Sequence, residues 1–220
     1  VRVGSARPFG PRGEPSAIAK QPVRVPVMAR PDGLAGDEQG DRRYHGGPDK
    51  AVHAYAAANY PLWAAEHPEL VDRFRPGAFG ENLVVEGITE AGICLGDRWR
   101  LGRVLLEVSQ GRQPCWKLNL RFGRPDMARL VQASGRTGWY FRVIEPGEIA
   151  PGRAVLEARP HPDWPLARVW WLLYHDRLNQ PALREFAALP GLPESWRRLA
   201  ERRLASGRTE DWTRRVVTPE

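Results

Sequence analysis

The stretch "RWRLGRVLLEVSQGRQPCWKLN", residues 98–119, joins a hairpin pattern to one of only two cysteines in a chain of 220 residues. Residues 98–101 and 104–108 have the composition and alternation of strands, and Gly102 lies between them. Such a pattern predicts two antiparallel strands joined by a tight turn. The second strand leads directly to Cys115, so a thiol follows soon after the end of a predicted strand.

Cys115 has two cationic neighbours in sequence, Arg112 and Lys117. An unperturbed thiol has a pKa of about 8.5, and nearby cations favour its thiolate, which is the form that acts as nucleophile or soft-metal ligand. An inert core cysteine fits these local features equally well. Cys94 lies among apolar residues and is interpreted as packing. Two cysteines are too few for a disulfide framework or a paired zinc motif.

Short strand patterns separated by glycine and proline continue through the first 160 residues and favour a β-barrel or sandwich. One helical insertion is expected in this part, with Asp49 as the N-cap of a helix to residue 58 and a second short helix over 61–67. Besides the hairpin, the predicted strands cover residues 18–28, 83–85, 139–144 and 154–159.

The pattern becomes helical from residue 163 onward. Val169, Leu172 and Leu173 have helical spacing, and residues 181–189 and 195–204 also resemble helices, the last capped by Ser195. The predicted fold is therefore mainly β with helical additions (α+β). Its predicted domains are a barrel-like domain, residues 1–162, and a small helical domain, residues 163–220.

The charge pattern bears on partners and location. A net charge of +7 favours anionic partners. Nucleic-acid binding is not expected, because no known recognition motif is found and Glu194 and Glu201 interrupt the arginines of the last helix. No apolar stretch approaches the roughly 20 residues of a membrane span, and no signal-peptide core is found, so we expect a cytoplasmic protein without a membrane partner.

Three further segments are weak candidates for ligand contacts. Asn82, directly before a predicted strand, could hydrogen-bond a planar heterocycle, and Lys20 could meet a phosphate. The turn at residues 45–47 could present backbone N–H groups to an anion. Ordinary turns explain the glycine and asparagine positions equally well.

Taken together, several segments resemble, in order and spacing, the bacterial YiiM-like branch of the MOSC domain proteins. The resemblance extends from about residue 13 to residue 216. It implies a MOSC-type β-barrel that binds molybdenum cofactor, followed by a small C-terminal three-helix domain. The segments that carry it are "PSAIAK" (15–20), "GLAGDEQGDRRYHGGPDKAVHAY" (33–55), "FGENLVVEGITE" (79–90), "SQGRQPCWKLN" (109–119) and "GRTEDWTRRV" (207–216).

The resemblance also implies a set of site residues. Cys115 stands where the family has its molybdenum ligand, and it is the residue expected to be catalytic. Gly111 and Gln113 depart from the family pattern, in which a proline and a small hydroxyl residue are common at these positions. Candidates for the proton donor are Glu81, Asp37, Glu38 and Asp41. The residues expected to bind the cofactor are Lys20, His45, Gly46, Gly47, Asn82, Ser109, Arg112 and Lys117.

The activity implied by the resemblance is an oxidoreductase that reduces N-hydroxylated purines or related bases to amines and so detoxifies them. No flavin, haem or iron–sulfur motif is visible in the sequence, so electrons are expected from a separate reductase, a flavoprotein. Two alternatives stay open: a non-catalytic carrier of molybdenum cofactor, and a sulfur-transfer protein with a persulfide on Cys115. The helical domain could close over the pocket, form a homodimer contact or dock the electron donor.

Overall fold

The computed structural model describes residues 1–40 and 46–219. In chain order the helices are η1 (Pro48–Lys50), α2 (Asn59–Glu66), η2 (Pro68–Arg73), α3 (Lys117–Phe122), α4 (Met127–Ser134), α5 (Leu166–Tyr174), α6 (Gln180–Ala187), α7 (Glu194–Ser206) and α8 (Thr213–Val216). The strands are β1 (Arg2–Val3), β2 (Arg7–Pro8), β3 (Pro15–Ser16), β4 (Gln21–Pro22), β5 (Val27–Arg30), β6 (Gly33–Leu34), β7 (Val52–Ala56), β8 (Leu83–Val85), β9 (Arg98–Leu101), β10 (Val104–Gly111), β11 (Trp139–Glu145), β12 (Gly147–Ile149) and β13 (Ala154–Ala158).

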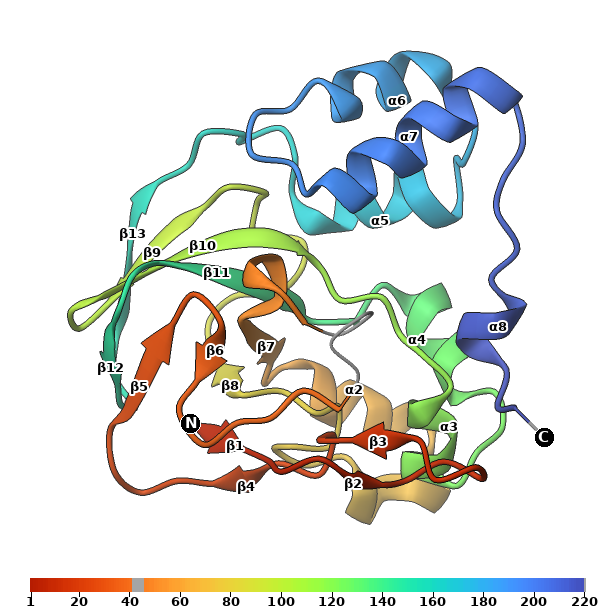
Figure 1. The fold of residues 1–220 in the computed structure, drawn as a ribbon. Helices are drawn as coiled ribbons and strands as arrows, with labels where there is room; N and C mark the ends of the chain where they lie inside the picture. Colours follow the sequence, from red (N-terminus) through yellow and green to blue (C-terminus); the bar gives the residue numbers. More distant parts are fainter. Residues whose placement is uncertain (41–45, 220) are drawn as a thin grey trace.

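The central element is a curled six-stranded sheet with the strand order β13-β9-β10-β11-β7-β8 (Figure 1). All neighbouring strands are antiparallel except β7 and β8, which run parallel. The predicted hairpin is confirmed: β9 and β10 pair Leu101 with Val104, and Gly102 takes the left-handed conformation at φ 60° that the tight turn requires. Smaller sheets, β12-β5-β6, β1-β4 and β2-β3, lie around the N-terminal part of the chain.

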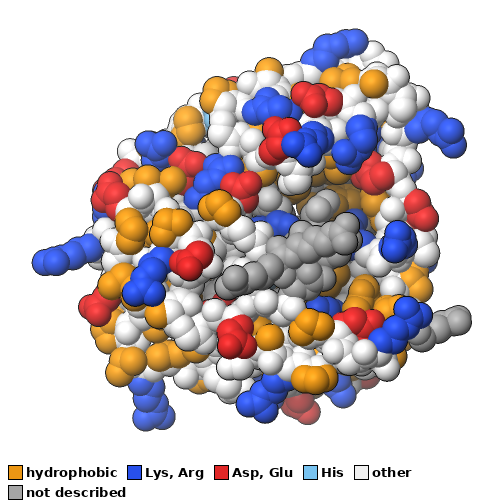
Figure 2. Space-filling model, in the orientation of Figure 1, with side chains coloured by type: hydrophobic (Ala, Val, Ile, Leu, Met, Phe, Trp, Pro, Cys, Tyr) orange, Lys and Arg blue, Asp and Glu red, His pale blue; other side chains and the backbone are white. Residues whose placement is uncertain are grey.

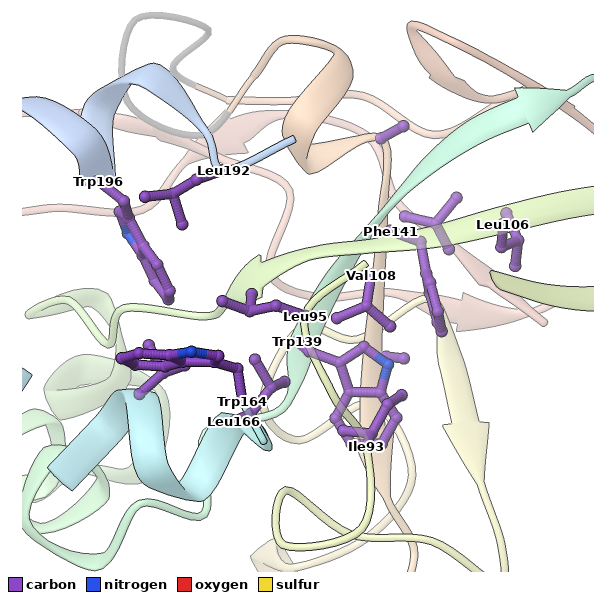
Figure 3. Close-up of a cluster of buried hydrophobic side chains, with 14 of the residues drawn as sticks. Ile93, Leu95, Leu106, Val108, Trp139, Phe141, Trp164, Leu166, Leu192 and Trp196 are labelled. Atoms are coloured by element: carbon purple, nitrogen blue, oxygen red, sulfur yellow. The ribbon is translucent and has the colours of Figure 1, made fainter. Parts of the chain in front are cut away.

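Helices α5, α6 and α7 form a group beside one end of the sheet, which confirms the predicted mainly β fold with three C-terminal helices (Figure 1). One cluster of buried apolar side chains connects this group to the sheet. In Figure 3, Trp196 and Leu192 lie near Trp164, and the cluster continues to Val108 and Trp139 of the sheet. The helices are therefore joined to the sheet by shared packing. The domain boundary after residue 162 stays a prediction.

The helix predicted over residues 49–58 is wrong. The short η1 is followed by β7, which pairs with both β11 and β8. Every residue of β7 is buried, so its sequence VHAYA lacks the alternation of a half-exposed strand. The helix predicted over 61–67 is confirmed by α2, which begins slightly earlier. Periodicity alone could not separate the buried strand from a buried helix.

Other departures have local causes. The strand predicted over residues 18–28 is broken into β4 and β5, because Pro22 and Pro26 cannot donate a backbone hydrogen bond to a sheet. Ser195 does not cap α7, which begins at Glu194 after Pro193. Helices α3 and α4 were not predicted at all.

Charge is distributed without a continuous basic surface on the face shown in Figure 2, where lysine and arginine side chains are interspersed with acidic ones. Within the described residues, no helix has the length and apolar character needed to cross a membrane.

Candidate functional site

Cys115 lies in a short loop between the end of β10 and the start of α3. Only 8% of its surface is exposed, and it lines a cavity at this edge of the sheet. The loop is tied to the strand beside it, because the Arg112 backbone N–H donates to the Gly138 carbonyl over 3.0 Å. The predicted hairpin thus places the thiol on the wall of a cavity. A cysteine that only packs in the core would not be accessible from a cavity.

The C-terminal segment holds the same loop from the other side. The Trp116 backbone N–H donates to the Arg215 carbonyl over 2.7 Å, and the Arg215 guanidinium donates to the Pro114 carbonyl. One turn later, Asn119 Nδ2 donates to the Val216 carbonyl over 3.0 Å. Residues on both sides of Cys115 are therefore fixed by α8, which lies about one hundred positions away in sequence.

We expect Arg215→Gln to loosen this loop while the rest of the fold persists. The arginine also donates to Gln132 Oε1 over 2.6 Å, so its loss removes charge-assisted hydrogen bonds worth about 1.5–3 kcal/mol each. Alkylation of the Cys115 thiol by iodoacetamide should become several-fold faster. Arg214→Gln is the matched control, because Arg214 is exposed on the same helix. Equal alkylation rates in both variants would contradict a positioning role for Arg215.

Four cationic side chains line the same cavity as the thiol. Arg112, Lys117 and Lys20 are all buried, and all three line the cavity with Lys50. Lys117 Nζ donates to the Pro15 carbonyl over 2.6 Å, but Nη1 of Arg112 has no hydrogen-bond acceptor among the described residues. Leaving a buried cationic donor without an acceptor is costly. The cavity is therefore suited to an anionic ligand.

A buried ion pair forms a second part of the wall. Lys20 Nζ donates hydrogen bonds to both carboxylate oxygens of Asp37, and Asn82 Nδ2 donates to Asp37 over 2.8 Å. The Asn82 oxygen accepts from the His53 backbone N–H over 3.0 Å, so the Asn82 amide holds Asp37 and β7 in place. Burial lowers the pKa of Lys20, and the charge of Asp37 opposes this shift.

Two cavity residues, His53 and Tyr140, were missed by the sequence analysis. They are cross-strand partners of β7 and β11, with ring centroids 5.1 Å apart. Burial, together with the positive charge of Arg112, lowers the pKa of His53 to about 3, so this histidine is neutral at pH 7. Desolvation raises the pKa of Tyr140, which keeps its hydroxyl protonated. Their pairing depends on strand register, which no local sequence signal revealed.

Several predicted residues lie elsewhere or outside the described residues. Ser109 is not part of the cavity lining. Its hydroxyl shares its one proton between the backbone carbonyls of Asp49 and Tyr140, 2.5 and 3.1 Å away. Gly46 and Gly47 also lie outside the lining, although Gly47 takes the left-handed conformation at φ 94° that begins η1. His45 lies outside the described residues.

The candidate proton donors differ in position. Asp37 and Glu38 line the cavity, whereas Glu81 does not. The Glu81 carboxylate is fully buried and accepts hydrogen bonds from the Tyr60 hydroxyl and the Phe79 backbone N–H at 2.5 and 3.0 Å. Glu81 therefore organises the turn before β8. Asp41 lies outside the described residues.

Comparison with known proteins places these features in a family. Residues 41–156 match the MOSC domain, and residues 164–207 match the YiiM-like 3-alpha helix domain. The chain is 38% identical over 206 residues to the protein YiiM of Escherichia coli, covering 94% of this chain and 92% of YiiM. A protein of Gibberella moniliformis described as a reductase is 38% identical over 94% of this chain, which spans 37% of that longer protein.

Solved structures agree with the sequence comparison. The crystal structure of YiiM from Escherichia coli superposes with a TM-score of 0.83 and 32% identity, covering 99% of both chains. That of YiiM from Geobacillus stearothermophilus gives a TM-score of 0.79 and 35% identity, over 93% of this chain and 96% of the other. Both the barrel-like part and the helical part are matched. The chain belongs to the YiiM-like MOSC domain proteins, a family related to molybdenum cofactor and to reductases.

Proposed function

We propose that this protein is a molybdenum cofactor-dependent reductase that converts N-hydroxylated purines or related bases to amines. The observation that carries the proposal is the Cys115 thiol on the wall of a cavity that is also lined by four cationic side chains and two acidic ones. A thiolate is a soft ligand suited to molybdenum, and guanidinium and ammonium groups suit the phosphate of a pterin cofactor. The residues present therefore fit the cofactor that the family implies.

Three residues of the cavity would hold the cofactor in this proposal. When bound, the cofactor supplies the two-electron redox chemistry. Cys115 provides the protein ligand to its metal, and Arg112 and Lys117 neutralise its negative charge. Arg112 is the best placed of these cations, since its Nη1 atom has no acceptor among the described residues.

Proton supply also falls to the chain. Reduction of an N–OH group breaks the N–O bond with two electrons and two protons, and it yields an N–H bond and water. Tyr140 lines the cavity and its hydroxyl stays protonated, so in this proposal it donates a hydrogen bond to the leaving oxygen. His53, being neutral at pH 7, offers no cation there. The candidate proton donors Asp37 and Glu38 line the same cavity.

The proposal is tested by turnover of 6-N-hydroxylaminopurine to adenine with reduced viologen as electron donor. Protein expressed in a cofactor-competent host should form adenine at a rate proportional to its molybdenum content. NADPH alone should give no turnover, and addition of a flavoprotein reductase should restore it. Tight cofactor binding without any adenine formation would favour the carrier function instead. A persulfide on Cys115, seen as a mass increase of the intact protein, would favour sulfur transfer.

A further inference from the structure

A second pocket adjoins Lys20, and four of its ten lining residues are arginines. Its volume is about 670 Å³, within the range of roughly 300–1,000 Å³ typical of small-molecule sites. The arginines come from three separate parts of the chain: Arg2 from β1, Arg73 and Arg75 from the end of η2 and the loop after it, and Arg121 from α3. We call this the arginine pocket. Arg2 and Arg121 are half-buried in this pocket, whereas Arg73 and Arg75 are exposed at its rim.

The arginines of this pocket lack acidic partners. None of the four forms an ion pair within the described part of the chain, although arginines elsewhere, such as Arg142 and Arg159, do. The lining holds the four arginines, Lys20 and one carboxylate, that of Asp72, which leaves four positive charges. Three remain when Lys20 is counted as neutralised by its ion pair with Asp37. A multiply charged anion would balance this excess better than one carboxylate could.

Three of the four guanidinium groups donate to backbone carbonyls. Arg121 Nη2 donates to the Gly77 carbonyl over 3.3 Å, and Arg73 Nη1 donates to the Arg121 carbonyl over 3.2 Å. Arg2 Nη2 donates to the Lys20 carbonyl over 3.0 Å, while its Nε atom is buried without an acceptor. Burial lowers the pKa of Arg121, and the negative charge of Glu81 opposes this shift. The positive charges of the other three arginines lower the pKa further. The unbound pocket is therefore electrostatically crowded.

We propose that the arginine pocket binds the phosphate group of a small molecule of about nucleotide size. Arginine presents a planar fork of donors that matches phosphate oxygens, and several such forks can share one phosphate or a pair of them. A phosphate or diphosphate carries two or more negative charges, which matches the charge excess of the lining. The inference goes beyond the proposed reductase activity when the occupant is a free nucleotide, and it rests on that proposed function when the phosphate is the cofactor's own.

The pocket is adjacent to the Cys115 cavity. Lys20 lines both. Along α3, Lys117 faces the cavity and Arg121, four residues later, faces the arginine pocket, a rise of about 6 Å along the helix. The phosphate could therefore belong to a free nucleotide or to the cofactor itself. The two sources share the same chemistry at the arginines.

Calorimetric titration with ADP, AMP, inorganic phosphate and uncharged adenosine tests the proposal. It is carried out on cofactor-loaded protein and on cofactor-free protein, with loading measured as molybdenum content. We expect ADP to bind, adenosine not to bind, and the affinity for ADP to fall about tenfold in Arg75→Gln and in Arg121→Gln. Arg75 is exposed, so its variant should fold normally. Arg129→Gln, on the exposed face of α4, is the matched control and should bind like wild type.

The two sources of phosphate give different results. Equal ADP affinity in loaded and cofactor-free protein identifies a free nucleotide as the occupant. Binding only to cofactor-free protein, together with lower molybdenum content in the Arg75 and Arg121 variants, identifies the cofactor's own phosphate. Absence of ADP binding from both forms, with normal molybdenum content in the variants, would overturn the proposal. So would ADP binding that neither variant weakens.

Discussion

Cys115→Ala abolishes molybdenum retention and reductase activity while the protein stays folded: this is the largest functional effect that we expect from a single substitution. The thiol has only 8% exposure and forms part of the wall around the predicted metal position. Alanine removes the sulfur and leaves the buried cations Arg112 and Lys117 in place. The phosphate contacts alone should hold the cofactor too weakly to survive purification.

The measurement is molybdenum per protomer by elemental analysis, with the unfolding temperature recorded alongside. Cys94→Ala is the matched control, because Cys94 is also buried, at 3% exposure, but belongs to a turn where its backbone N–H donates to Asp97 Oδ2 over 3.0 Å. The control should keep wild-type molybdenum content. Near-stoichiometric molybdenum in Cys115→Ala would show that the metal is not held by this thiol.

Trp196→Ala should lower the free energy of unfolding by about 3–5 kcal/mol, the usual cost of truncating a large buried aromatic side chain. Trp196 is 1% exposed and packs against Phe186, with ring centroids 5.8 Å apart. It belongs to the buried cluster shared by the C-terminal helices and the sheet (Figure 3). We therefore expect sheet and helices to unfold together, in one transition at a lower denaturant concentration.

Urea titration followed by far-ultraviolet circular dichroism and by tryptophan fluorescence measures this effect. Trp171→Ala is the control, since Trp171 is 60% exposed on α5 and its loss should change stability by roughly 0.5 kcal/mol or less. Two separate transitions in Trp196→Ala, with the fluorescence and dichroism midpoints no longer coinciding, would show that the helical part unfolds independently. That result would support the boundary predicted after residue 162.

Much of the fold followed from local sequence patterns. The β9–β10 hairpin around Gly102, strand β8 and the amphipathic spacing of α5 were all predictable, because each has its turn residue or apolar periodicity within a few positions. Strand β7 was not, because burial on both faces removes the alternation by which a strand is recognised. The alanines of this segment, after Asp49 as a possible N-cap, instead resembled the start of a helix.

The candidate site divides in the same way. The sequence indicated Cys115, Arg112 and Lys117, because a thiol with cationic neighbours in the chain is a candidate nucleophile or metal ligand. The family resemblance strengthened this interpretation and added Lys20 to the candidate site. The sequence did not indicate Asp37 as the partner of Lys20, because an ion pair between residues 17 positions apart depends on how β-strands and loops come together.

By itself, the sequence determined the hairpin, the helical character of the C-terminal part and the position of a cysteine among cations, all of which depend on neighbouring residues. Only the tertiary structure decided which of these groups meet. The register of β7 against β11 brings His53 to Tyr140, and the return of the chain end brings Arg215 to the Cys115 loop. The physical reason is that strand pairing and burial of a shared core act between distant residues, so their outcome is not encoded in any single segment.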